Sequence, residues 1–158
     1  MARQTIPVSI ERRVRAEAHN RCGYCLSPQH LVMARLEIEH IIPLAQGGTD
    51  EETNLWLACP LCNSHKSDKI IGLDLESGES VPLFNPRVQV WSEHFQWAED
   101  GIHLLGKTPI GRATIAALQL NDDSDALLVR SYWVMAGWHP PKMNDPDTKQ
   151  AKKKDAGK

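Results

Sequence analysis

Residues 36–69 read LEIEHIIPLAQGGTDEETNLWLACPLCNSHKSDK and decide the fold of the chain. Polar and apolar residues alternate over 36–42, which predicts a β-strand. The paired glycines within 46–50 predict a loop, because glycine relaxes the backbone. The apolar residues 56–58 predict a return strand, and 61–69 are short enough to form one small helix. The stretch therefore predicts a β-hairpin followed directly by a helix.

All cysteines of the chain lie in two C-x-x-C pairs, Cys22/Cys25 and Cys59/Cys62, with 33 residues between the pairs. Two such pairs can place four thiolates around one Zn²⁺ ion in a tetrahedral S₄ site. The gap exceeds the usual spacing of a zinc ribbon, so something of the size of a hairpin lies between the pairs. Disulfides and a thioredoxin-like redox pair are the alternatives; a cytoplasmic chain disfavours the first, and the lack of a βαβ pattern disfavours the second. A closed S₄ site has no open coordination position, so we assign the zinc a structural role.

The segment between the cysteine pairs, with the residue just after them, carries side chains suited to phosphodiester hydrolysis. His40 has an imidazole that can take the proton from an attacking water. Glu39 and Asn63 offer the hard oxygen ligands that a Mg²⁺-type ion prefers. Asn54 can hold the imidazole or a neighbouring carbonyl in place. The alternatives are a structural histidine at 40, an ordinary strand carboxylate at 39 and a turn asparagine at 54.

These residues stand in motifs that closely resemble the HNH endonuclease family over residues 20–70. The motifs are, in order, Glu39-His40-Ile41-Ile42-Pro43-Leu44, Gly47-Gly48-Thr49-Asp50, Asn54-Leu55 and Cys59-x-x-Cys62-Asn63-x-x-Lys66. The resemblance implies a ββα-metal finger, with His40 as the general base and Asn54 as the loop residue that orients it. It also implies one divalent ion bound between Glu39 and Asn63.

The chain departs from the commonest pattern of that family at two positions. Glu39 stands where Asp is often found, and Asn63 stands where a further histidine is often found. Both keep an oxygen donor, which favours Mg²⁺ or Mn²⁺ over nickel or zinc at the catalytic position. His65 is the rival to Asn63, but the two point about 200° apart on a helix, so only one can face the hairpin. Asn63 directly follows the second cysteine pair, as in the family pattern, so it is favoured as the residue that faces the hairpin.

Glu39 poses a geometric difficulty. Neighbouring residues on a strand point to opposite faces, so a regular pleat would turn Glu39 away from a site that contains His40. We therefore expect the strand to twist or end there, close to Pro43.

The flanking segments complete an α+β fold, with a helix before the finger and a hairpin plus helices after it. A helix is predicted over 10–20, with Ser9 as its N-cap. Asp100-Gly101 predicts the turn of a hairpin. Thr108-Pro109 predicts a helix start, and a further helix is predicted over 124–136.

These elements predict that the chain is divided into three parts. Residues 1–71 form the N-terminal helix and the zinc-stapled HNH finger, 72–141 form an α+β extension packed on it, and 142–158 form a disordered Lys-rich tail. The second part holds four of the five tryptophans, which are expected in the core: Trp91, Trp97, Trp133 and Trp138.

The net charge is −2, but both ends are basic and the middle is acidic. Five Arg against two Glu give residues 1–21 a charge of +3, and six Lys against three Asp give 142–158 a charge of +3. Phosphate contacts are therefore expected from the N-terminal helix and from lysines near the site. The candidates are Lys66, Lys69, Arg12 and Arg13, followed by Arg87 and Arg112 in the extension.

The sequence has neither a signal peptide nor an apolar run long enough to cross a membrane, so a cytoplasmic protein is expected. The predicted function is a metal-dependent endonuclease that hydrolyses DNA, by nicking or by cutting both strands. Double-strand cutting would need two sites, and a homodimer or an accessory protein is one way to supply them. The alternative is a zinc-stabilised module that binds nucleic acid or a protein without cutting.

Overall fold

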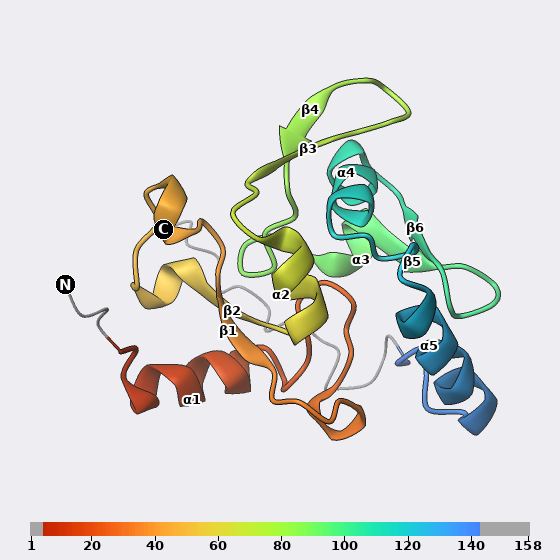
Figure 1. The fold of residues 1–158 in the computed structure, drawn as a ribbon, viewed down its shortest axis with the longest axis horizontal. Coiled ribbons are helices and arrows are strands. Elements are labelled where there is room, and N and C mark those ends of the chain that lie inside the picture. Colours follow the sequence, from red (N-terminus) through yellow and green to blue (C-terminus); the bar gives the residue numbers. More distant parts are fainter. Residues whose placement is uncertain (1–4, 143–158) are drawn as a thin grey trace, which may run out of the picture.

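The computed structural model describes residues 5–142, which form five α-helices, short 3₁₀ turns and three two-stranded antiparallel sheets (Figure 1). This mixture of helices and small sheets confirms the predicted α+β fold class. The predicted Lys-rich tail over 142–158 lies, apart from Lys142, outside the described residues. Within 5–142, no helix combines the length and the hydropathy needed to cross a membrane.

Helix α1 (Val8–Glu17) begins earlier than its sequence signals indicate. Pro7 occupies the N-cap position, and the predicted cap Ser9 lies inside the first turn. Proline suits a helix entry because its fixed φ already matches the helix and its missing N–H needs no partner. The helix also ends earlier than predicted, at Glu17, and His19 and Asn20 follow with positive φ values of 52° and 53°.

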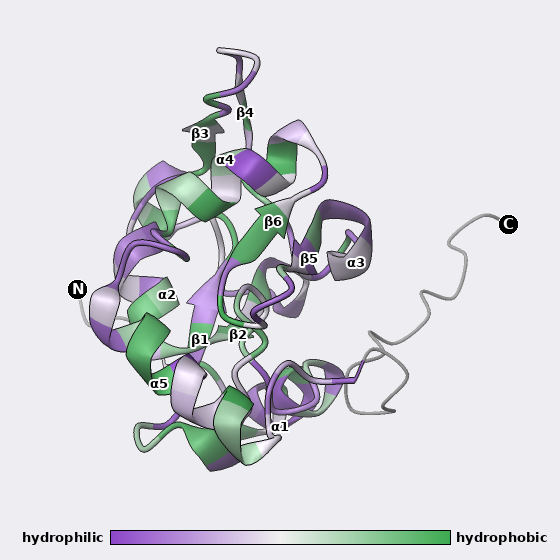
Figure 2. Ribbon diagram, turned by 90° about the vertical axis from the view of Figure 1, so that its right-hand side faces the viewer, coloured by the Kyte–Doolittle hydropathy of each residue, from purple (hydrophilic) through white to green (hydrophobic). Residues whose placement is uncertain are grey.

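Strands β1 (Glu37–His40) and β2 (Leu55–Ala58) form the predicted hairpin. Their antiparallel register places Glu37 opposite Ala58 and His40 opposite Leu55. All four residues of β2 are buried, whereas β1 carries two glutamates and a histidine. Figure 2 accordingly shows β1 mainly in the hydrophilic colour. β1 therefore delivers polar side chains to the site while β2 anchors the hairpin in the core.

Helix α2 (Pro60–Lys66) follows β2 directly and packs against β1. Cys59 is its N-cap, and its Sγ accepts a hydrogen bond from the Cys62 amide at 3.4 Å. Pro60 occupies the first helical turn, where proline is favoured. The helix stops earlier than predicted because Ser67 has a positive φ of 51°.

The extension begins with a hairpin that was not predicted from the sequence. It consists of β3 (Ile71–Leu73) and β4 (Ser80–Pro82), and it packs against helix α4 (Pro109–Ala117). A short helix α3 (Trp91–His94) follows, which was also not predicted. Both were missed because three or four residues are too few to show a periodicity.

The rest of the extension follows the predicted pattern. Strands β5 (Phe95–Trp97) and β6 (Leu104–Gly106) form a hairpin whose turn contains Gly101 at φ 69°. Helix α4 is capped by Thr108, whose Oγ1 accepts from the Gly111 amide at 3.0 Å. Helix α5 (Ser124–Ala136) has the predicted bounds and ends at Gly137, which has a φ of 79°.

One hydrophobic core joins the finger to the extension. Its buried residues include Tyr24 and Trp56 from the first part and Phe84, Trp91 and Phe95 from the second. The Trp91 indole donates to the Tyr24 carbonyl at 2.8 Å, which satisfies its buried N–H. Of the four tryptophans expected in the core, Trp91 is buried, whereas Trp138 is 63% exposed.

Two arginines that were proposed to contact DNA form ion pairs and hydrogen bonds within the fold. Arg112 pairs with both oxygens of the fully buried Asp74 carboxylate, at 2.9 and 3.0 Å. These bonds hold the pKa of Asp74 well below its usual range. Arg87 donates to Glu17 at 2.8 Å and to the Leu55 carbonyl at 3.1 Å. Both guanidinium groups are thus engaged within the fold, contrary to the prediction.

Candidate functional site

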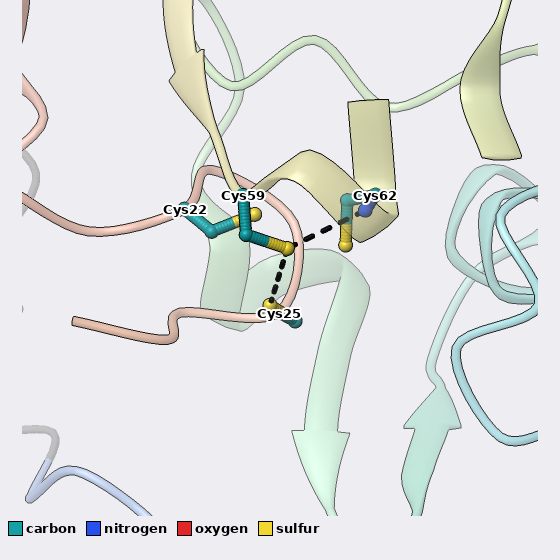
Figure 3. Close-up of side chains that lie close together, drawn as sticks. All are labelled: Cys22, Cys25, Cys59 and Cys62. Carbon is teal, nitrogen blue, oxygen red and sulfur yellow. Dashed lines mark hydrogen bonds between the residues drawn. The ribbon is translucent and has the colours of Figure 1, made fainter. Parts of the chain in front are cut away.

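The four cysteines meet where the loop after α1 approaches the start of α2 (Figure 3). All four are buried and free of disulfides, and their sulfur atoms all lie within 4.8 Å of one another. The Cys25 and Cys59 sulfurs are 3.8 Å apart. Bonds of about 2.3 Å in a tetrahedral S₄ site give a sulfur–sulfur distance of about 3.8 Å, so the cluster fits a zinc-sized ion. The predicted four-cysteine metal site is therefore present.

The thiols in this cluster perturb one another. Burial raises the pKa of the Cys22 thiol, and hydrogen bonds from neighbouring cysteines raise that of Cys62. Hydrogen bonds from Cys22, Cys59 and Cys62 lower the pKa of Cys25. Several thiolates confined in one buried place repel each other, so the cluster needs a cation to become fully deprotonated.

Asn54 closes the loop between β1 and β2 through its side chain. Its Oδ1 accepts from the Ile42 amide at 2.9 Å, and its Nδ2 donates to the carbonyls of Ile42 at 2.9 Å and Thr49 at 2.8 Å. Gly48 fits beside this junction because a Cβ there would lie 1.7 Å from the Ile42 oxygen. Asn54 thus holds the chain just after His40 against the chain just before Asp50.

His40 ends β1, and its imidazole contacts Asp50. The distance from Nε2 to the Asp50 Oδ1 is 2.6 Å. An ionised carboxylate can only accept, so Nε2 donates in this contact, and in a neutral imidazole Nδ1 is then the acceptor. Asp50 was missed as a site residue because in the sequence it reads as a turn or capping residue after Gly47-Gly48. Only the closed loop brings it to the imidazole.

A hollow of about 480 Å³ opens beside His40. Its walls also include Glu37 from the other end of β1 and Asn63 and Ser67 at α2. The Asn63 Nδ2 donates to the Glu37 Oε1 at 3.1 Å, so the amide oxygen of Asn63 points away from that carboxylate. The structure thus brings His40 and Asn63 to one hollow, with Glu37 as an unexpected third member.

Glu39 does not line this hollow. It is 2% exposed, and its Oε1 accepts from the Tyr24 hydroxyl at 2.7 Å and pairs with the Lys66 ammonium at 2.9 Å. The strand was expected to twist or end near Glu39; the pairing is regular up to His40, where β1 ends, so no twist intervenes and the pleat separates Glu39 from His40. Burial raises the pKa of Glu39, although the Lys66 charge opposes that shift.

Glu39 retains one unused oxygen. Its Oε2 is buried and has no hydrogen-bond partner among residues 5–142. Glu37 and Glu39 point to the same side of β1, the side on which α2 packs, because Glu37 contacts Asn63 and Glu39 contacts Lys66. Within the described part of the chain, the Glu39 carboxylate therefore keeps one buried oxygen without a hydrogen-bond partner on the side of β1 that faces α2.

Lys66 is not available to a phosphate, contrary to the prediction. Its side chain is 2% exposed, and its Nζ bonds the carbonyls of His40 at 3.1 Å and Ile41 at 2.9 Å as well as Glu39. The helical spacing correctly placed it on the face of Asn63, but that face packs on β1. Lys66 therefore holds the end of β1 onto α2.

Replacing Lys66 by methionine is expected to lower the free energy of unfolding by about 3–5 kcal/mol, because the Glu39 charge and two carbonyls lose their partner in the interior. Urea unfolding of the zinc-loaded protein measures the change. Lys69→Met is the matched control, since that exposed lysine lies three residues away and bonds only backbone carbonyls among the described residues. Equal midpoints for the two variants would show that the buried pair contributes nothing.

The remaining candidates lie apart from the hollow. His65 approaches Asp123 at 3.7 Å, which agrees with the choice of Asn63 as the residue facing the hairpin. Arg13 forms a two-bond pair with Glu52 at 2.9 and 3.0 Å, whereas Arg12 is exposed. Lys69 is exposed, and its Nζ bonds the His65 carbonyl at 2.9 Å. Arg12, Arg13 and Lys69 are all exposed and remain predictions as phosphate contacts.

Comparison with known proteins adds one finding. Residues 22–69 match the sequence model described as HNH endonuclease. The matched segment begins at the first cysteine and ends just after α2, so it contains the metal cluster, the hairpin and the hollow. No curated protein and no solved structure matches the chain.

Proposed function

We propose that the chain, which carries an HNH endonuclease domain over residues 22–69, is a metal-dependent endonuclease that hydrolyses phosphodiester bonds of DNA. The observation that carries this proposal is the His40–Asp50 contact of 2.6 Å at the edge of a hollow that also contains Asn63. A module that only binds nucleic acid does not need an imidazole that is oriented by a carboxylate at the edge of a hollow.

His40 acts as the general base. Because its Nε2 donates to Asp50, its Nδ1 can accept a proton from water as the water oxygen attacks phosphorus. The bond from phosphorus to the leaving oxygen breaks, and solvent protonates that oxygen. Asp50 holds the ring in the required tautomer and stabilises the imidazolium that forms.

Asn54 positions this pair rather than touching the substrate. Its side chain bonds both backbone groups of Ile42 and the Thr49 carbonyl. It therefore fixes both ends of the loop that lies between His40 and Asp50. A small change in their distance would weaken the hydrogen bond steeply. This agrees with the orienting role implied by the family resemblance.

Asn63 and Glu39 would hold the catalytic divalent ion, Mg²⁺ or Mn²⁺, with their side-chain oxygens. When bound, such an ion neutralises charge on the phosphate and stabilises the leaving oxygen. Glu37 supports the site by holding the Asn63 amide nitrogen. Electron paramagnetic resonance of Mn²⁺ tests the assignment: Asn63→Ala should weaken binding about tenfold or more, whereas His40→Ala should not.

The four-cysteine cluster holds a structural Zn²⁺ ion. Its sulfurs come from two separate places, the loop after α1 and the start of α2, so one ion ties α1 to the finger. The cluster is closed and buried, so no coordination position is left for chemistry.

Purified protein incubated with supercoiled plasmid tests the function. Nicked or linear plasmid should form with Mg²⁺ or Mn²⁺ and not without an added divalent ion. The control omits the ion rather than adding EDTA, because a chelator could also remove the structural zinc. If the zinc-loaded protein shifts plasmid in a gel but leaves it supercoiled with every metal, the non-catalytic binding module is the better description.

Replacing Asp50 by asparagine is expected to lower kcat about 100-fold with little change in KM. The amide of the new side chain can donate to Nε2, which moves the ring hydrogen to Nδ1 and blocks the base. Cleavage kinetics on a labelled duplex separate kcat from KM, and Asp68→Asn, an exposed change of the same kind, is the control. A lower affinity at unchanged kcat would contradict the positioning role.

A further inference from the structure

A second polar pocket, of about 500 Å³, lies where α1 ends and the first cysteine loop begins. None of its lining residues lines the catalytic hollow. Its polar lining residues come from the end of α1 and from the residues that surround the Cys22/Cys25 loop, and none of them is acidic. They are Arg15, His19, Asn20, Arg21, Gln29 and His30.

Positive charge is concentrated at this pocket. Burial lowers the pKa of Arg15, and the nearby charge of Arg35 lowers it further, against a smaller opposing effect of Glu11. Two arginines that repel each other gain from an anion placed near both. Arg13, two residues earlier on α1, differs because it pairs with the Glu52 carboxylate.

The pocket walls are fixed by backbone and side-chain contacts. Arg21 pairs with Pro28 across the cysteine loop, and its Nη1 donates to the Leu26 carbonyl at 3.0 Å. His19 has a positive φ of 52°, and its Nε2 is buried without a hydrogen-bond partner among residues 5–142. The bridge to Pro28 and the Arg21 hydrogen bond therefore hold the wall of the pocket that adjoins the cysteine loop.

We propose that this pocket binds a backbone phosphate of the nucleic-acid substrate, away from the bond that is cut. Arginine guanidinium groups match phosphate oxygens in geometry and charge, and the imidazoles of His19 and His30 line the same pocket. The inference rests on the proposed nuclease function. It adds a phosphate contact to a site whose own hollow contains the Glu37 carboxylate, which repels phosphate.

The location of the pocket would allow this phosphate contact to position the nucleic-acid strand relative to the protein. α1 packs against β2, and the cysteine loop joins the pocket to the metal cluster that begins α2. A phosphate held there is connected through rigid elements to the hairpin that carries His40. Contacts with phosphates carry no sequence information, but they fix the position of the strand relative to the protein.

Binding of a fluorescein-labelled DNA duplex to the zinc-loaded protein, measured by anisotropy across a salt series without added divalent ion, tests the proposal. Arg15→Gln should weaken binding about tenfold at about 0.1 M salt and reduce the slope of log K against log salt by about one. Arg35→Gln, an exposed change on a different segment, should act in the same direction. Arg15→Lys should keep the slope because it keeps the charge.

Lys107→Gln is the control, because it removes the same charge from an exposed residue at the end of the β5–β6 hairpin. The proposal is overturned if Arg15→Gln and Arg35→Gln bind the duplex no more weakly than Lys107→Gln. Plasmid cleavage by wild type is scored separately. A protein that cuts plasmid while its arginine variants bind normally retains the nuclease function and loses only the pocket.

Discussion

His40→Ala is expected to lower the rate of metal-dependent plasmid cleavage by about 10²–10⁴-fold, the usual contribution of general acid–base catalysis. The variant removes the imidazole at the hollow, whose hydrogen bond to Asp50 leaves a lone pair for a proton from water. The imidazole side chain is 11% exposed and its main polar partner is Asp50, so the fold should survive the change. Initial rates of nicking at saturating Mg²⁺ measure the loss.

His65→Ala is the matched control for this prediction. It deletes the same side chain from α2, where the imidazole faces Asp123 and not the hollow. Thermal unfolding of both variants excludes loss of structure as the cause. Equal cleavage rates for His40→Ala and wild type would remove the enzymatic interpretation altogether, whereas equal loss in both histidine variants would place the base elsewhere.

Short-range signals in the sequence predicted most of the frame. The bounds of α5, the cap of α4 by Thr108 and the turn at Gly101 depend on a few consecutive residues, so local rules suffice for them. The two C-x-x-C pairs predicted a long-range contact for a different reason. Thiolates at that spacing have few uses in one chain besides a shared metal ion.

The polar interior of the finger could not be predicted in the same way. Lys66 shares a helical face with Asn63, and the sequence does not say whether that face meets solvent or a strand. Its burial against Glu39 depends on how α2 packs on β1. Asp50 likewise reads as a turn residue until the loop held by Asn54 brings it to His40. Charged residues are rarely buried, so propensity argued against the Glu39–Lys66 pair.

The alternation of side chains along a strand predicted the orientation of Glu39 correctly. The family resemblance, in contrast, implied that Glu39 and His40 serve one site. A regular strand does turn Glu39 away from His40, and no bend intervenes. His40 and Glu39 therefore lie on opposite sides of β1, whereas Asn63 lines the same hollow as His40. His40 is fixed by the loop through Asp50, and the ligands are fixed by α2, so the hairpin and the helix must stay in register for the two to act together.

Removal of zinc is expected to unfold residues 22–69 and to abolish cleavage even when Mg²⁺ is present. Structural zinc contributes roughly 10–16 kcal/mol in small zinc-bound domains, which equals or exceeds the whole stability of a typical domain. The loss should spread beyond the finger, because the cysteines belong to the same core as Phe84, Trp91 and Phe95 of the extension. The zinc-free protein should therefore lack the cooperative thermal transition that the zinc-loaded protein shows.

Cys25→Ser and Cys62→Ser together decide whether a shared ion is responsible. The two residues lie on separate elements, the loop after α1 and helix α2, and both sulfurs belong to the same buried cluster. If one ion joins them, each variant should lose the single zinc measured by elemental analysis and should melt alike, although they change different parts of the chain. If instead either variant keeps its zinc and its melting temperature, the cysteines are ordinary core residues. The position of His40 relative to α2 would then have to be maintained by the Lys66 contacts and the core alone.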